Sequence, residues 1–128
     1  MAKVLLIDDD VDLIEANKAV LTARGHDVSV AYTAEEARKS LDKVVPDVAV
    51  IDVMMETDSA GFDLARDIHE KFPSLPAVIL SGIREAKELS FSFEPDDTYM
   101  PVLKFMEKPV EPAKLADQIE QIVSGTNQ

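Results

Sequence analysis

The chain has 128 residues, of which 46% are hydrophobic and 30% are charged, a composition typical of one soluble globular domain. Its 13 basic and 25 acidic residues leave a formal charge of −12, which disfavours direct binding to nucleic acid or to an anionic membrane. It contains no cysteine, so disulfides, thiolate metal sites and a cysteine nucleophile are excluded. Because no apolar run reaches the roughly 18 residues of a membrane span and no signal peptide is evident, we expect a cytoplasmic protein.

Strand and helix patterns alternate in the first part of the chain. Residues 4–7 form a continuous apolar run, which predicts a strand buried on both faces, and residues 27–31 alternate as a second strand. A helix is expected between the N-cap Asp10 and the stop residue Gly25, and another behind Thr33, which begins a capping-box sequence. The side chains expected to face the core are Leu13, Ala16, Val20 and Leu21 in the first helix and Ala34, Ala37 and Leu41 in the second.

The same alternation continues to the C-terminus. Residues 47–52, 76–81 and 103–107 are expected strands, and helices are expected from Gly61 and from Pro112. Residues 85–99 lose their period and are expected to be half helix and half loop. The order predicts an α/β fold with five parallel strands and five crossovers. The expected core residues are Phe62, Ala65, Ile68 and Phe72 in the first of these helices and Leu115, Ile119, Ile122 and Val123 in the last.

Polar residues stand where the predicted strands end, at the edge where open parallel sheets bind ligands. Asp8, Asp9 and Asp10 follow the first strand, and Asp52 ends the third. We expect Asp10 to act mainly as the helix N-cap. If the first and third strands are neighbours, the remaining carboxylates converge, and two unit charges 4 Å apart repel by about 4 kcal/mol at an effective dielectric of 20. A divalent cation removes this conflict, and hard oxygen ligands favour Mg²⁺.

Such a site suits phosphoryl transfer. An aspartate carboxylate is an established nucleophile for forming an acyl phosphate, so Asp52 is the candidate nucleophile. The added charge would be neutralised by the ammonium group of Lys108, the hydroxyl of Ser81 and the unobstructed backbone amide of Gly82, which follow the fifth and fourth strands. Each of these residues alone is weak evidence, but their joint placement at four strand ends specifically indicates a phosphoryl-transfer site.

Four segments in order resemble the motifs of the receiver domain of two-component response regulators: VLLIDDDVDL, VAVIDVMM, AVILSG and FMEKPV. The resemblance spans essentially the whole chain, with residues 1–124 as the receiver domain and 125–128 as a frayed tail. It implies a doubly wound, flavodoxin-like (CheY-like) α/β fold. The implied sheet has five parallel strands in the order 2-1-3-4-5, with helices on both faces.

The resemblance also implies the function. Asp52 would accept a phosphoryl group from a histidine kinase or a phosphotransfer protein, with Ser81 and Phe105 as the switch residues that respond to it. The chain would then be a signalling module rather than an enzyme, with only Mg²⁺-dependent self-phosphorylation and self-dephosphorylation. A downstream protein would read the switched surface, and a phosphorylation-dependent homodimer stays open. The implied Mg²⁺ ligands are Asp9, Asp52 and the backbone carbonyl of Met54, with Asp8 acting through a bound water.

Three other classes share part of this pattern. A haloacid-dehalogenase-like phosphatase would use Asp8 and Asp10 as nucleophile and acid, but it requires a further acidic strand end after Lys108, which the sequence does not show. A flavodoxin has the same architecture, but its hydroxyl- and glycine-rich phosphate loop is absent after the first strand. A degenerate receiver that only docks partners is the third alternative, and the intact acids, Ser81 and Lys108 argue against it.

Overall fold

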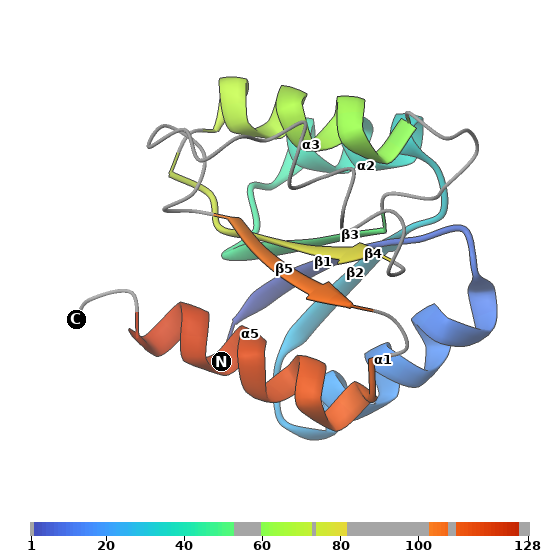
Figure 1. Cartoon of the computed structure of the whole chain (residues 1–128), viewed down its shortest axis with the longest axis vertical. Helices are drawn as coiled ribbons and strands as arrows, with labels where there is room; N and C mark the ends of the chain where they lie inside the picture. The colour runs from blue at the N-terminus through green and yellow to red at the C-terminus, as the bar shows by residue number, and fades with distance from the viewer. Residues whose placement is uncertain (1, 53–59, 73, 82–102, 108–109, 126–128) are drawn as a thin grey trace.

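The computed structural model describes residues 2–52, 60–72, 74–81, 103–107 and 110–125 of the chain (Figure 1). The expected segment 85–99 therefore lies outside the described residues, as does most of the expected tail. The elements are β1 (Lys3–Ile7), α1 (Val11–Ala23), β2 (Asp27–Ala31), α2 (Ala34–Lys43), β3 (Val48–Asp52), α3 (Ala60–Lys71), β4 (Ala77–Ser81), β5 (Leu103–Glu107) and α5 (Pro112–Gly125).

All strand pairs of the sheet are parallel, and the strand order is β2-β1-β3-β4-β5. The α2 and α3 helices cover one face of the sheet, and α1 and α5 cover the other (Figure 1). The expected α/β class, the parallel sheet and the helices on both faces are confirmed. Within the described residues, no helix combines the length and the apolarity needed to cross a membrane.

The core lies on both faces of the sheet because the side chains of each strand alternate in direction. In β1, Leu5 and Ile7 pack on the face covered by α2 and α3, whereas Val4 and Leu6 pack on the face covered by α1 and α5. Each of these four side chains is at most 2% exposed, and full burial of such a side chain stabilises the fold by about 1.5–3 kcal/mol. Helices thus cover both faces of the sheet at its centre, and the strand ends remain the part of the sheet that a ligand can reach.

The helix boundaries follow the capping signals of the sequence. Asp10 is the N-cap of α1, and the Thr33 hydroxyl caps α2 by accepting the backbone N–H of Glu36 at 3.1 Å. The Glu36 carboxylate in turn accepts the backbone N–H of Tyr32 at 2.9 Å, which completes a capping-box arrangement. Gly25 has a φ of 91°, the left-handed conformation that glycine adopts after a helix. These predictions are confirmed.

The buried stripe of α1 differs from the expected one. Ala16 is exposed, and the buried side chains are Ile14, Asn17 and Leu21. The expectation was wrong for Ala16, because it ranked positions by polarity, whereas the packing of α1 against the sheet and α5 turns Asn17 inward. Leu21 is buried and Val20 packs against the core as expected. Within the described residues, the side-chain oxygen of Asn17 is buried without a hydrogen-bond partner, an arrangement that costs free energy.

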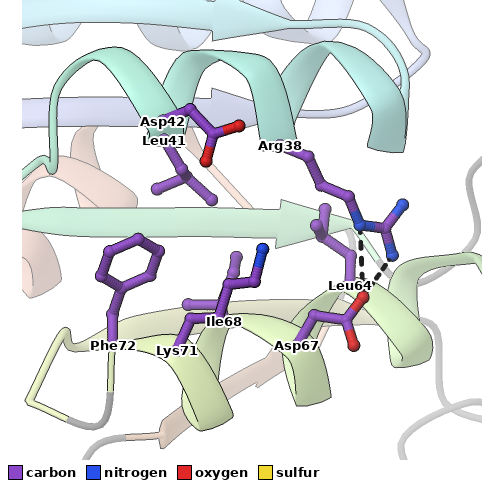
Figure 2. Close-up of a pocket in the computed structure, with 8 residues that line it drawn as sticks. All are labelled: Arg38, Leu41, Asp42, Leu64, Asp67, Ile68, Lys71 and Phe72. Atoms are coloured by element: carbon purple, nitrogen blue, oxygen red, sulfur yellow. Dashed lines mark hydrogen bonds and ion pairs between the residues drawn. The ribbon is translucent and has the colours of Figure 1, made fainter.

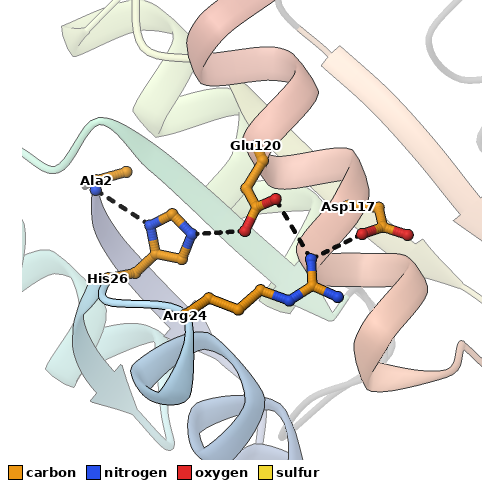
Figure 3. Close-up of polar contacts among 5 residues, drawn as sticks. All are labelled: Ala2, Arg24, His26, Asp117 and Glu120. Atoms are coloured by element: carbon orange, nitrogen blue, oxygen red, sulfur yellow. Dashed lines mark hydrogen bonds and ion pairs between the residues drawn. The ribbon is translucent and has the colours of Figure 1, made fainter.

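A polar network ties α5 to the turn after α1 (Figure 3). The backbone N–H of Ala2 donates to His26 Nδ1 at 3.1 Å, so the ring accepts there and its Nε2–H donates to Glu120 Oε2 at 3.0 Å. Arg24 Nη1 donates to Glu120 Oε1 at 3.3 Å and to Asp117 Oδ1 at 2.7 Å. The hydrogen bond from His26, followed by that from Arg24, lowers the pKa of Glu120 below its ordinary value.

An isolated histidine is expected on the solvated surface, but both histidine side chains of this chain are largely buried. The His26 side chain is 8% exposed, and His69 is 7% exposed. His26 is covered because its ring lies between the start of β1 and α5 (Figure 3). Nothing in the local sequence around His26 signals this burial, since its partner Glu120 is 94 positions away.

Candidate functional site

The site is built by the central strands of the sheet. Ile7, the last residue of β1, pairs with Ile51 of β3. Asp8 directly follows β1, and Asp52 is the last residue of the neighbouring parallel strand β3. The backbone N–H of Asp8 donates to the carbonyl of Ala31 at 3.1 Å, which continues the hydrogen bonding between β1 and β2. Asp8 is thereby fixed at the carboxyl edge of the sheet beside Asp52.

Three carboxylates meet at this edge. One oxygen from each of Asp8, Asp9 and Asp52 can be chosen so that all lie within 4.8 Å of one another. Asp8 is 4% exposed and Asp52 is 2% exposed, whereas Asp9 is exposed to solvent. The structure thus places two acids inside the fold and the third at the opening.

Asp10, the fourth candidate acid, lies outside this cluster. Its carboxylate accepts the backbone N–H of Leu13 at 3.1 Å, which makes it the N-cap of α1 as the sequence predicted. Its own backbone N–H donates to Asp8 Oδ1 at 2.9 Å. Sequence reasoning missed this second bond, although an aspartate two residues before a helix cap is a pattern typical of such a turn.

The donor set fits a divalent cation. Two unit charges 4 Å apart repel by about 4 kcal/mol at an effective dielectric of 20, and here two of the three carboxylates are buried. Carboxylate oxygens are hard ligands, and a few of them completed by water suit Mg²⁺ better than a softer metal. The residues present therefore match the chemistry of Mg²⁺, and a cation would relieve the repulsion that the fold imposes.

The remaining candidates are placed by backbone register alone. Asp52 pairs with Leu80 of β4, so Ser81 ends the neighbouring strand one residue further along. Ser81 pairs with Glu107 at the end of β5, and Phe105 of β5 pairs with Ile79. The expected roles of Met54, Gly82 and Lys108 fall outside the described residues, so these remain predictions.

A hollow lies between α2 and α3, on the face of the sheet away from α1 and α5 (Figure 2). Leu41 and Phe72 are among the apolar residues that line it. Arg38 of α2 closes one end by an ion pair with Asp67 of α3, with an Nη2 to Oδ2 distance of 2.6 Å. No residue expected at the phosphoryl site lines this hollow, so it is separate from the acidic cluster.

Comparison with known proteins identifies the family. The family model of the response regulator receiver domain matches residues 4–120. The transcriptional regulatory protein CpxR of Klebsiella pneumoniae is 31% identical over 125 residues, which cover 96% of this chain and 50% of CpxR. The regulatory protein PhoP of Bacillus subtilis is 26% identical over 123 residues, which cover 94% of this chain and 48% of PhoP. The chain thus spans about half the length of these two regulators.

Solved structures agree on the fold. The receiver domain of NtrX from Brucella abortus has a TM-score of 0.81 and 23% identity, and the match covers 94% of this chain and 98% of that domain. A response regulator receiver domain from Clostridium thermocellum has a TM-score of 0.83 and 22% identity, with 99% and 98% coverage. Because the family model matches residues 4–120, the chain belongs to the family of response regulator receiver domains, the signalling modules of phosphorelays.

Proposed function

We propose that the chain is a phosphorylation switch whose phosphoacceptor is Asp52. A carboxylate oxygen of Asp52 forms a bond to the phosphorus of a phosphohistidine, and the bond between that phosphorus and the histidine nitrogen breaks. The nitrogen keeps the electron pair of the broken bond, and Asp52 becomes an acyl phosphate. The proposal is supported by the family and by the position of Asp52 at the end of β3, beside Asp8 and Asp9.

The observation that carries this proposal is the gathering of three carboxylates within 4.8 Å, two of them buried. A divalent cation bound between these carboxylates would offset their mutual repulsion. Bound Mg²⁺ would neutralise charge on the phosphoryl oxygens during transfer. The residues proposed to hold it are Asp9, Asp52 and the backbone carbonyl of Met54, with Asp8 acting through a bound water.

Four further residues complete the proposed switch. The ammonium group of Lys108, the hydroxyl of Ser81 and the amide of Gly82 would bind the phosphoryl oxygens and favour the phosphorylated state. Phe105 would change position together with Ser81. The backbone register supports this grouping, because Ser81 ends β4 next to β3 and Glu107, the residue before Lys108, ends β5 next to β4.

The partners follow from the same proposal. A sensor histidine kinase or phosphotransfer protein would supply the phosphoryl group in the cytoplasm, and a downstream protein would read the switched surface. A phosphorylation-dependent homodimer is one form this output can take.

We propose residues 1–124 as the receiver domain and 125–128 as a tail, with no catalysis beyond self-phosphorylation and self-dephosphorylation. Family membership supports this over the phosphatase and the flavodoxin.

The proposal is tested by mass spectrometry of the intact chain after incubation with a small phosphoramidate donor and Mg²⁺. One phosphoryl group should be added to the wild-type chain and none to Asp52→Asn. Glu70→Gln, which removes an exposed acid of α3 away from the cluster, should match the wild type. Equal labelling of Asp52→Asn and the wild type would exclude Asp52 as the acceptor.

A further inference from the structure

The Asp8 carboxylate is held in place by the backbone of Asp10. The N–H of Asp10 donates to Asp8 Oδ1 at 2.9 Å, while the N–H of Asp8 is bound to the carbonyl of Ala31 at 3.1 Å. The backbone and the side chain of Asp8 are thus fixed by different parts of the fold. Because Asp9 lies between two fixed residues, its backbone position is set as well.

Asp10 is itself fixed by α1. Its side-chain oxygen accepts the N–H of Leu13 at 3.1 Å, and its carbonyl accepts the N–H of Ile14 at 3.0 Å. Its backbone is extended, with φ −89° and ψ 102°, the conformation of an N-cap residue. One residue therefore links the first turn of α1 to the acid that lies beside Asp52.

We propose that Asp10 is a positioning residue for the cation site and not a ligand. Its cap holds the first turn of α1, the turn directs its backbone N–H, and the N–H orients the Asp8 carboxylate next to Asp52. The Asp10 carboxylate binds the helix and lies outside the cluster of Asp8, Asp9 and Asp52. The inference rests on the proposed function, because it explains how that site keeps its shape.

Two substitutions of Asp10 distinguish an effect of its helix cap from an effect of its negative charge. Asparagine caps a helix about as well as aspartate, whereas alanine does not. If Asp10 acts through its cap, Asp10→Asn keeps cation affinity within about twofold of the wild type, and Asp10→Ala weakens it on the order of tenfold, as the loss of outer-shell partners does. If the negative charge of Asp10 attracts the cation instead, Asp10→Asn and Asp10→Ala weaken cation binding to the same extent.

The measurement is a titration of the purified chain with Mn²⁺, which takes the same oxygen ligands as Mg²⁺ and is detected by electron paramagnetic resonance. Thr33→Ala is the matched control, because it removes the N-cap of α2 without touching the site. Both alanine variants should lower the Tm by about 2–8 °C, but only Asp10→Ala should lose Mn²⁺ affinity.

Two results overturn the inference while leaving the proposed function intact: wild-type affinity in Asp10→Ala, or equal loss in Asp10→Ala and Asp10→Asn. Asp9→Asn reports on the proposed function separately, because Asp9 is a proposed ligand. If Asp9→Asn binds Mn²⁺ as tightly as the wild type, the cation site itself is wrong, and the inference about Asp10 is rejected with it.

Discussion

His26 Nε2 lies 3.0 Å from Glu120 Oε2, so the turn after α1 and the middle of α5 are joined by a hydrogen bond across 94 positions of sequence. The Glu120 carboxylate also accepts from Arg24 at 3.3 Å. Both contacts favour the charged carboxylate, and together they lower the pKa of Glu120 from the ordinary 4.5. When folding lowers the pKa of a carboxyl group, that group stabilises the fold at pH values above its pKa in the unfolded chain. The stabilisation is lost as the pH falls through its pKa in the folded chain.

We therefore expect Glu120→Gln to destabilise the chain at neutral pH and to have less effect below pH 4.5. Since the Glu120 side chain is 39% exposed, solvent screens these contacts, and the loss should be about 0.2–1 kcal/mol. Urea unfolding between pH 7 and pH 3 measures it. Glu15→Gln, at an exposed position of α1, is the control and should change little. An equal effect of Glu120→Gln at pH 7 and pH 3 would contradict the prediction.

Asn17→Leu should stabilise the chain. The side-chain oxygen of Asn17 is buried and has no hydrogen-bond partner among the described residues, and an unsatisfied buried polar group costs about 1–3 kcal/mol. Leucine has the same branched arrangement of side-chain heavy atoms and would join the cluster that contains Ile14 and Leu21. The expected gain is about 1 kcal/mol in the free energy of unfolding.

Ala16→Leu is the matched control for this substitution. It adds a leucine one position away on α1, but at an exposed site, and should change stability by no more than about 0.5 kcal/mol. A stabilisation by Ala16→Leu equal to that by Asn17→Leu would indicate a general gain in helix propensity. Destabilisation by Asn17→Leu would contradict the prediction.

Asp52→Asn should make the metal-free chain more stable and less responsive to Mg²⁺. The substitution removes one charge from the cluster with Asp8 and Asp9, whose carboxylate oxygens lie within 4.8 Å of one another, and two unit charges 4 Å apart repel by about 4 kcal/mol at an effective dielectric of 20. In the wild type, Mg²⁺ at ten times its Kd should raise the unfolding free energy by about 1.4 kcal/mol.

Thermal unfolding with and without Mg²⁺ measures both effects. Asp12→Asn removes a charge from the first turn of α1 outside the cluster and is the control for general electrostatics. The wild-type chain and Asp12→Asn should show the same Mg²⁺-dependent rise in Tm, and Asp52→Asn should show a smaller one. The same rise in all three would mean that Mg²⁺ does not bind at the cluster.

The strands and helices could be predicted because each is specified by a pattern of neighbouring residues. The apolar runs that became β1, β3 and β4 end at Ile7, Asp52 and Ser81, and Asp10 and Thr33 start their helices as N-caps. Parallel strands bring their carboxyl ends to one edge, so the approach of Asp8, Asp9 and Asp52 followed once the family resemblance supplied the strand order.

What could not be predicted depends on contacts between distant segments. Polarity alone placed Ala16 inside, but the position of α1 against α5 exposes Ala16 and buries Asn17 instead. His26 is buried because α5 carries Glu120 to it, and the local sequence holds no sign of this. The bond from the Asp10 N–H to Asp8 required the turn geometry between β1 and α1. The roles expected of Met54, Gly82 and Lys108 stay predictions, as do those of Ser81 and Phe105.

The most direct test of the account is to find which carboxylate carries the phosphoryl group. Reduction of the labelled chain with borohydride converts an aspartyl phosphate into a stable alcohol, and cleavage after lysine and arginine then separates residues 4–18, with Asp8, Asp9 and Asp10, from residues 44–66, with Asp52. The account predicts the mark at Asp52 in the peptide 44–66. A mark at Asp8 in the peptide 4–18 would contradict it and favour the phosphatase-like use of the first strand.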